Sequence, residues 1–108
     1  NVMAYDAGKN FVIGTPPIYQ TALQNYAKAV GNPGKVVLGL DLQSQWDFAG
    51  PFQETCDQIG TQAQWAYQNS GITGGTFLWE IGDDSNACHA LPALTAMTAA
   101  ETRQSKLN

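Results

Sequence analysis

The stretch that most constrains the fold of this chain is residues 74–84, GGTFLWEIGDD. A glycine pair opens the stretch, an apolar run follows, and acidic residues end it. Buried parallel strands read as near-continuous apolar runs, and the loops that leave their carboxyl ends form the ligand crevice of α/β folds. The stretch therefore predicts a buried strand over 75–81, with Trp79 and several acids at the edge where ligands bind.

The rest of the chain repeats this strand pattern, and a helical pattern follows each strand. Strands are predicted over 1–5 and 35–40, followed by Asp6 and Asp41. Helices are predicted over 15–30, over 51–68 and from a start between 86 and 89 to about 103, with loops over 6–10 and 43–52. Strands that alternate with helices imply a parallel sheet with right-handed crossovers. The pattern predicts an α/β fold of three consecutive β-α units.

Each predicted helix carries one apolar stripe, and two helix starts carry polar signals. Thr15 is expected to cap the first helix, which the 31–34 segment GNPG ends. Glu54 and Asp57 are predicted near the amino end of the second helix, where negative charge suits the dipole. Trp65 falls opposite the stripe and is read as a surface aromatic or a contact to another part of a larger protein. The predicted stripes are Ile18, Ala22, Leu23, Tyr26 and Val30; Phe52, Cys56, Ile59, Ala63 and Ala66; and Leu91, Leu94, Met97 and Thr98.

Three units of roughly 35 residues match the pitch of an eight-unit (β/α)8 barrel, which typically has about 250 residues. Alone, such a sheet has two open edges and one uncovered face, which would expose Met3, Tyr5, Phe77 and Trp79 to water. We therefore expect residues 1–108 to be an incomplete barrel, covered by the remaining barrel segment or by self-association. A start at Asn1 rather than methionine favours a processed or truncated chain.

Composition and cysteine usage set further bounds. Nine acidic and five basic residues give a net charge of −4, opposite to what nucleic acid requires. No apolar run reaches the roughly 20 residues of a membrane span. Cys56 and Cys88 could be two buried thiols or one disulfide. With His89 as the single histidine and no paired C-x-x-C spacing, we expect no metal and no cofactor.

Three strand segments stand out: MAYD at residues 3–6, KVVLGL at 35–40 and GGTFLW at 74–79. They resemble the sixth, seventh and eighth strands of family 18 glycoside hydrolases, the chitinases and their relatives. Residues 3–6, MAYD, are similar to the M-x-Y-D motif that ends the sixth strand of that family. Residues 35–40, KVVLGL, resemble the seventh strand, and residues 74–79, GGTFLW, resemble the eighth, which ends in a tryptophan. The three matches stand in the family's order and cover most of the chain. The resemblance implies the C-terminal segment of a TIM-barrel catalytic domain.

The resemblance also implies a ligand, chitin or an N-acetylglucosamine oligosaccharide, and a secreted, extracellular protein. Family members use the acetamido oxygen of the sugar as the nucleophile, an exception to the two-carboxylate scheme. Tyr5 would orient that acetamido group, and Asp6 would bind a sugar hydroxyl near the cleavage point. Trp79 would lie beneath the −1 sugar. On the same side, Met3, Asp41 and Trp46 are candidate binding residues, Asp41 as a partner behind the site and Trp46 as a stacking residue further along the cleft.

The chain departs from the family at the catalytic acid. The family's general acid is a glutamate that ends a D-x-x-D-x-D-x-E motif on the fourth strand, and these 108 residues contain no such motif. Glu80 follows a different strand. General acid catalysis contributes roughly 10²–10⁴-fold. We therefore expect this chain alone to be inactive, although a barrel completed by the first five units could act as a glycosidase.

Other interpretations stay open for the same residues. Tyr5 could be an ordinary core tyrosine, and Trp46 could hold its own loop down. The acids Asp41, Glu80, Asp83 and Asp84 are more simply solvated carboxylates than a cation site. At the level of function, the alternatives are a non-catalytic, lectin-like chitin-oligosaccharide-binding protein and a small self-associating α/β domain.

Overall fold

The structure, a computed structural model, describes residues 1–3, 9–42, 45–47, 50–80, 82 and 87–107. The chain is a small mixed α/β domain, which confirms the predicted fold class at that level. In chain order its elements are α1 (Lys9–Ile13), α2 (Ile18–Val30), the 3-10 turn η2 (Pro33–Lys35), β1 (Val37–Asp41), β2 (Gln45–Asp47), β3 (Gly50–Phe52), α3 (Cys56–Gln68), β4 (Gly75–Trp79) and α4 (Ala90–Leu107).

The sheet at the centre of the domain is parallel. β1 and β4 pair along their whole length, in a register that runs from Val37↔Gly75 to Asp41↔Trp79. Val2 adds a parallel bridge to the other edge of β1, where its N–H and C=O each form a 2.8 Å hydrogen bond. Residues 4 and 5 of the predicted first strand lie outside the described residues. Three parallel segments thus lie side by side in chain order.

The two glycines at the start of β4 are explained by two different physical constraints. Gly74 donates to Val36 O at 2.7 Å, and a Cβ on Gly74 would collide with the backbone of Gly34. Gly75 has a φ of 136°, a conformation that side chains rarely adopt. The pair therefore lets the chain pass close to the η2 turn and enter β4.

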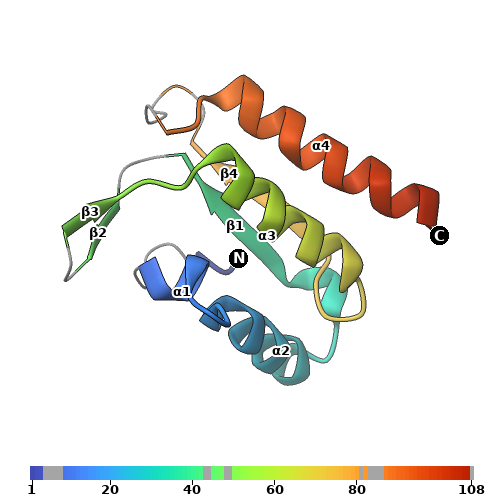
Figure 1. Cartoon of the computed structure of the whole chain (residues 1–108). Helices are drawn as coiled ribbons and strands as arrows, with labels where there is room; N and C mark the ends of the chain where they lie inside the picture. Colours follow the sequence, from blue (N-terminus) through green and yellow to red (C-terminus); the bar gives the residue numbers. More distant parts are fainter. Residues whose placement is uncertain (4–8, 43–44, 48–49, 81, 83–86, 108) are drawn as a thin grey trace.

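The core lies between the sheet and the helices. Figure 1 shows α3 in front of β1 and β4, with α2 and α4 on either side of α3. α3 packs on both strands and along α4. The two helices approach closely at Gly60, where an added Cβ would lie 3.5 Å from the Ala96 side chain. The largest fully buried apolar side chains are Tyr19, Leu23, Leu38, Leu40, Leu42 and Ile59.

The start and the buried face of α2 differ from the prediction. The helix begins at Ile18, with Pro17 rather than Thr15 at the N-cap and no side-chain cap. It ends as predicted, with Gly31 in the left-handed conformation at φ 73°. Of the predicted stripe only Leu23 is fully buried, and the residues that accompany it inward are Tyr19 and Ala27. The helix carries two apolar stripes, and packing against α3 and the sheet selects the second.

The segment before α3 was also predicted differently. The predicted loop over 43–52 contains an antiparallel hairpin, β2–β3, which Figure 1 shows projecting away from the helices. α3 begins at Cys56 rather than at residue 51, because Thr55 and Gln58 form a capping box that places the helix start there. A short helix, α1, also begins at Lys9, inside the predicted loop over 6–10.

The inward faces of α3 and α4 correct two further predictions. Trp65 is half-buried, and its ring meets that of Tyr19 edge-on, with centroids 5.3 Å apart. α4 buries Ala93 and Ala100, whereas the predicted inward residue Leu91 is 75% exposed. Small side chains face α3 because the two helices pack closely, so the larger residues of α4 are left outside.

Candidate functional site

The candidate site lies at the carboxyl ends of the parallel strands. Asp41 ends β1 and Trp79 ends β4, and the two residues are partners in the strand register. Register partners in a parallel pair share one face of the sheet. The N–H of Leu42 donates to Trp79 O at 2.6 Å, which fixes the two strand ends to each other. The peptide bond between Trp79 and Glu80 is cis. We call Asp41 and Trp79 the strand-end pair.

Burial divides the strand-end pair into an exposed residue and an enclosed one. Trp79 keeps 45% of its surface exposed, although strands of a parallel sheet are ordinarily buried on both faces. Asp41 is fully buried. The indole is therefore available to a ligand, while the carboxyl group of Asp41 lies behind the surface.

Met3 and Phe77 extend the candidate surface along the sheet. Met3 follows the residue that bridges Leu38, so it lies level with Gly39, which is the register partner of Phe77. Met3 is 51% exposed and Phe77 is half-buried. The predicted uncovered face of the sheet is therefore partly exposed at Met3 and Trp79.

Three of the predicted site residues remain predictions. Tyr5 and Asp6 lie outside the described residues. Trp46 is part of β2, so its backbone belongs to the hairpin that follows β1. Of the other acids in the sequence prediction, Glu80 is half-buried, whereas Asp83 and Asp84 also lie outside the described residues.

A buried acid that was not among the predicted site residues lies directly behind the strand-end pair. Glu54 is 1% exposed. Its Oε2 accepts the backbone N–H of Asp41 at 3.3 Å, and its Oε1 accepts the side-chain amide of Gln62, which is also 1% exposed. The same Gln62 amide donates to Gln58 O at 3.2 Å. A single carboxyl group thus connects the end of β1 to α3.

The surroundings of Glu54 favour its neutral form. The pKa of the Glu54 carboxyl is raised to about 7, mainly by burial. The hydrogen bond from Gln62 lowers this pKa, the negative charge of Asp41 raises it, and the backbone N–H of Asp41 lowers it. Burial also raises the pKa of Tyr19, with a smaller contribution from the charge of Glu54. Glu54 therefore changes charge near neutral pH.

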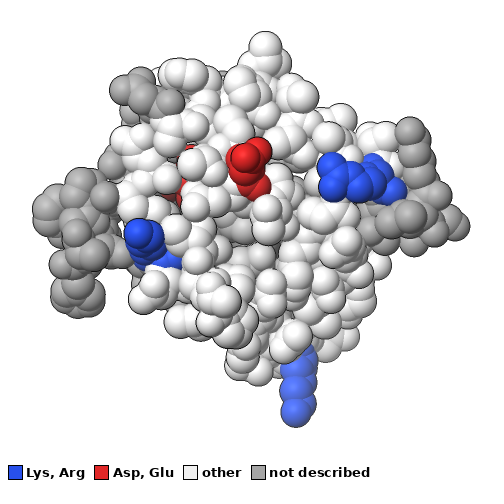
Figure 2. All heavy atoms as spheres, in the orientation of Figure 1, with Lys and Arg blue, Asp and Glu red and all other residues white. Residues whose placement is uncertain are grey.

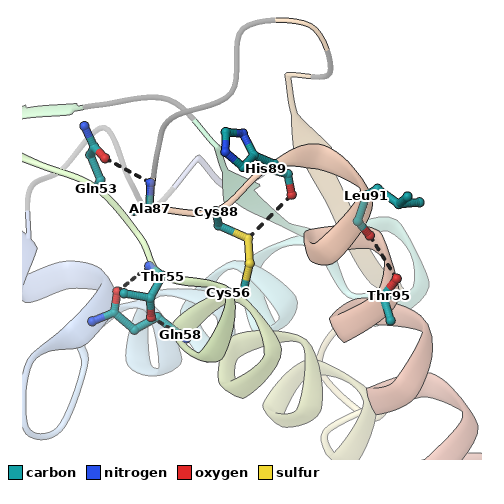
Figure 3. Close-up of a disulfide and its surroundings, with 9 residues drawn as sticks. All are labelled: Gln53, Thr55, Cys56, Gln58, Ala87, Cys88, His89, Leu91 and Thr95. Atoms are coloured by element: carbon teal, nitrogen blue, oxygen red, sulfur yellow. Dashed lines mark hydrogen bonds between the residues drawn. A yellow bond between two sulfur atoms is a disulfide. The ribbon is translucent and has the colours of Figure 1, made fainter.

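Glu54 is part of a short segment, residues 53–56, which we call the rim strap, and the contacts of its neighbours in this segment hold it in place. The Cys56 and Cys88 side chains form a disulfide, with Cα atoms 5.0 Å apart, so the pairing that the sequence left open is present (Figure 3). Gln53 accepts the N–H of Ala87 at 3.3 Å. The rim strap is thereby tied to the segment before α4 and, through Glu54, to β1 and α3.

The sequence contained a partial signal for this arrangement. Glu54 stands just before a capping threonine, where an acid ordinarily serves the helix dipole. Asp57 does occupy the first turn of α3 and is exposed, as that interpretation predicts. Glu54 precedes the helix, and its side chain turns inward, where it accepts hydrogen bonds from Asp41 N and the Gln62 amide, 13 and 8 residues away in the sequence. Local sequence does not reveal such partners.

Glu54 is poorly placed to act on a substrate directly. A general acid must reach the bond it protonates, within hydrogen-bond distance or through one water. Glu54 instead faces Asp41 N and Gln62 inside the domain. Among the described residues, no group of three or more histidine, cysteine, aspartate or glutamate side chains could hold a metal ion.

On the face that the helices cover, the charged side chains of the described residues are spread out. In Figure 2 the acidic atoms lie near the centre of this face, and the basic atoms lie at separate places towards its margins. Within the described part of the chain, no helix is both long and apolar enough to cross a membrane. Comparison of the chain with family models, with curated proteins and with solved structures finds no match.

Proposed function

We propose that this chain supplies the sugar-orienting half of a chitinase-like site and binds N-acetylglucosamine oligosaccharides without cleaving them alone. The observation that carries the proposal is the exposed indole of Trp79 at the carboxyl end of β4, beside Asp41. An indole face suits the C–H face of a pyranose ring, because both are apolar and flat. In this proposal Met3 widens the platform, and Tyr5 and Asp6 supply the polar contacts.

The sheet order supports a segment of a (β/α)8 barrel. Val2, β1 and β4 are parallel neighbours in chain order, with helices in the two connections between them. A barrel adds its strands in this sequential way. The proposal therefore treats the domain as three consecutive units of such a barrel.

Exposed apolar side chains on α2 and α4 support contact with further β-α units. On α2, Ile18 and Tyr26 are 48% and 54% exposed. Leu91 and Leu94 lie on α4 opposite the residues that face α3. In a complete barrel, the neighbouring helices would cover such exposed apolar side chains on α2 and α4. Self-association of the domain is the alternative partner.

The platform assignment is tested by Trp79→Ala. We expect this variant to bind chitotetraose at least tenfold more weakly than the wild-type chain in isothermal titration calorimetry, which corresponds to about 1.4 kcal/mol. The cause is loss of the apolar surface beneath the sugar. The matched control is Tyr26→Ala, which removes another exposed aromatic ring from α2 and should leave affinity unchanged. Equal affinity of the Trp79→Ala and wild-type chains would rule out the platform.

The absence of the acid motif leads to a second expectation. The chain should bind the oligosaccharide but should not hydrolyse a fluorogenic N-acetylglucosaminide above the buffer rate, because no residue is assigned to protonate the leaving oxygen. Turnover that survives extensive purification and disappears in Trp79→Ala would show that the chain contains a catalytic acid. That result would replace the binding role with an enzymatic one.

A further inference from the structure

We propose that Glu54 is a positioning residue of the candidate sugar site: its carboxyl group holds the carboxyl end of β1, and with it Asp41, against α3. The inference deepens the proposed function and rests on that function for the identity of the ligand. Glu54 itself does not touch the sugar. It acts through the strand that carries the strand-end pair.

The hydrogen-bonding pattern of β1 shows which edge of the strand the carboxyl group contacts. Along a strand, alternate N–H groups point to the same side. Gly39 N–H points to the outer edge of β1 and donates to Val2 O at 2.8 Å. The next N–H on that edge belongs to Asp41, and it donates to Glu54 Oε2. The carboxyl group thus accepts a hydrogen bond from the outer edge of β1 at the last residue of the strand.

The other contacts of the rim strap fix the position of the Glu54 backbone and side chain. The capping box fixes Thr55 at the start of α3, and the disulfide joins the next residue, Cys56, to Cys88. Glu54 Oε1 also accepts from Gln62, two turns into the same helix. The support acts on the site because Asp41 is the register partner of Trp79. A shift of the last β1 residue would therefore change the space beside the indole.

The charge of Glu54 gives this support a measurable signature. The titratable groups that face its carboxyl are Asp41 from β1 and Tyr19 from α2, while α3 presents the neutral Gln62. On protonation, one carboxyl oxygen becomes a donor. Within the described part of the chain, Gln62 Oε1 is a buried acceptor with no hydrogen-bond partner. If the Gln62 amide rotates, this oxygen can accept a hydrogen bond from the protonated carboxyl group. The negative charge beside Asp41 then disappears.

The experiment compares Glu54→Gln, a neutral replacement of the same shape, with the wild-type chain. The backbone amide of Asp41 is followed by ¹H–¹⁵N NMR between about pH 5 and 9, with a midpoint expected near the Glu54 pKa of about 7. The wild-type amide should show this step, and the Glu54→Gln amide should not. The control is Asp57→Asn, which removes an exposed carboxylate three residues away and should titrate like the wild type.

The same proteins are then tested for chitotetraose affinity at the two ends of this pH range. If ligand binding shifts the Glu54 pKa by about half a unit, the wild-type affinity changes about threefold with pH. The Glu54→Gln affinity should lose that dependence while the Asp57→Asn affinity keeps it. A role confined to general stability would not remove a pH dependence of binding.

Each result decides one part of the inference. The contact between Glu54 and β1 is overturned if the Asp41 amide shift of the wild-type chain shows no step near pH 7. It is also overturned if Glu54→Gln shows the same step as the wild type. If the Asp41 amide shift of Glu54→Gln does not change with pH while its chitotetraose affinity keeps the wild-type pH dependence, the role of Glu54 in the site is overturned. Failure of the wild-type chain to bind chitotetraose at any pH removes the proposed function, while the Asp41 amide still decides whether Glu54 holds the end of β1.

Discussion

Replacing both Cys56 and Cys88 with serine is expected to lower the free energy of unfolding by about 4 kcal/mol. The disulfide joins residues with a sequence separation of 32, and a crosslink that closes a loop of this length restricts the unfolded chain strongly. A domain of this size typically has about 5–15 kcal/mol of stability in total. Loss of this bond should therefore remove a large share of it.

Urea denaturation of the wild-type chain and of the double serine variant measures this effect. Wild-type protein that has been reduced and alkylated should resemble the variant, and reductant should leave the variant unchanged. If the variant loses less than about 1 kcal/mol, the crosslink does not restrict the unfolded chain to the expected extent. In that case the contacts of Gln53 with Ala87 and of α3 with α4 are sufficient to hold this part of the domain.

Glu54 is expected to make the free energy of unfolding fall by about 3 kcal/mol as the pH rises from about 4 to 8. Its pKa is about 7 in the folded chain, against an ordinary value of 4.5. Between these two values the folded chain holds a proton that the unfolded chain has released. The contribution is therefore fully present below pH 4.5 and is lost as the pH rises through 7.

Comparison with Glu54→Gln isolates this contribution from that of every other titrating group. The difference in unfolding free energy between variant and wild type should move by about 3 kcal/mol in favour of the variant from pH 4 to pH 8. Urea denaturation at intervals of half a pH unit resolves such a change. Parallel pH curves for the two proteins would show that Glu54 ionises in the folded chain as it does in the unfolded one.

Local patterns in the sequence predicted the order and type of the main elements. The β1 and β4 strands, the helix that Gly31 ends and the α3 helix all correspond to predicted segments, with ends displaced by up to about five residues. These features depend on backbone preferences and on the spacing of apolar residues, which neighbouring positions in the chain already specify. The same patterns led to the expectation that Asp41 and Trp79 meet at one edge, and the strand register places them together.

Packing, by contrast, decided which side of each helix is buried and where the acids lie. α2 and α4 each carry more than one apolar face, and the choice depends on how closely α3 approaches, so Leu91 is exposed while Ala93 is buried. The inward turn of Glu54 depends on Asp41 and Gln62, which only the folded chain brings to it. Residue type and spacing therefore set the elements, whereas contacts between distant segments set burial and charge, because desolvation and hydrogen bonding are properties of the assembled core.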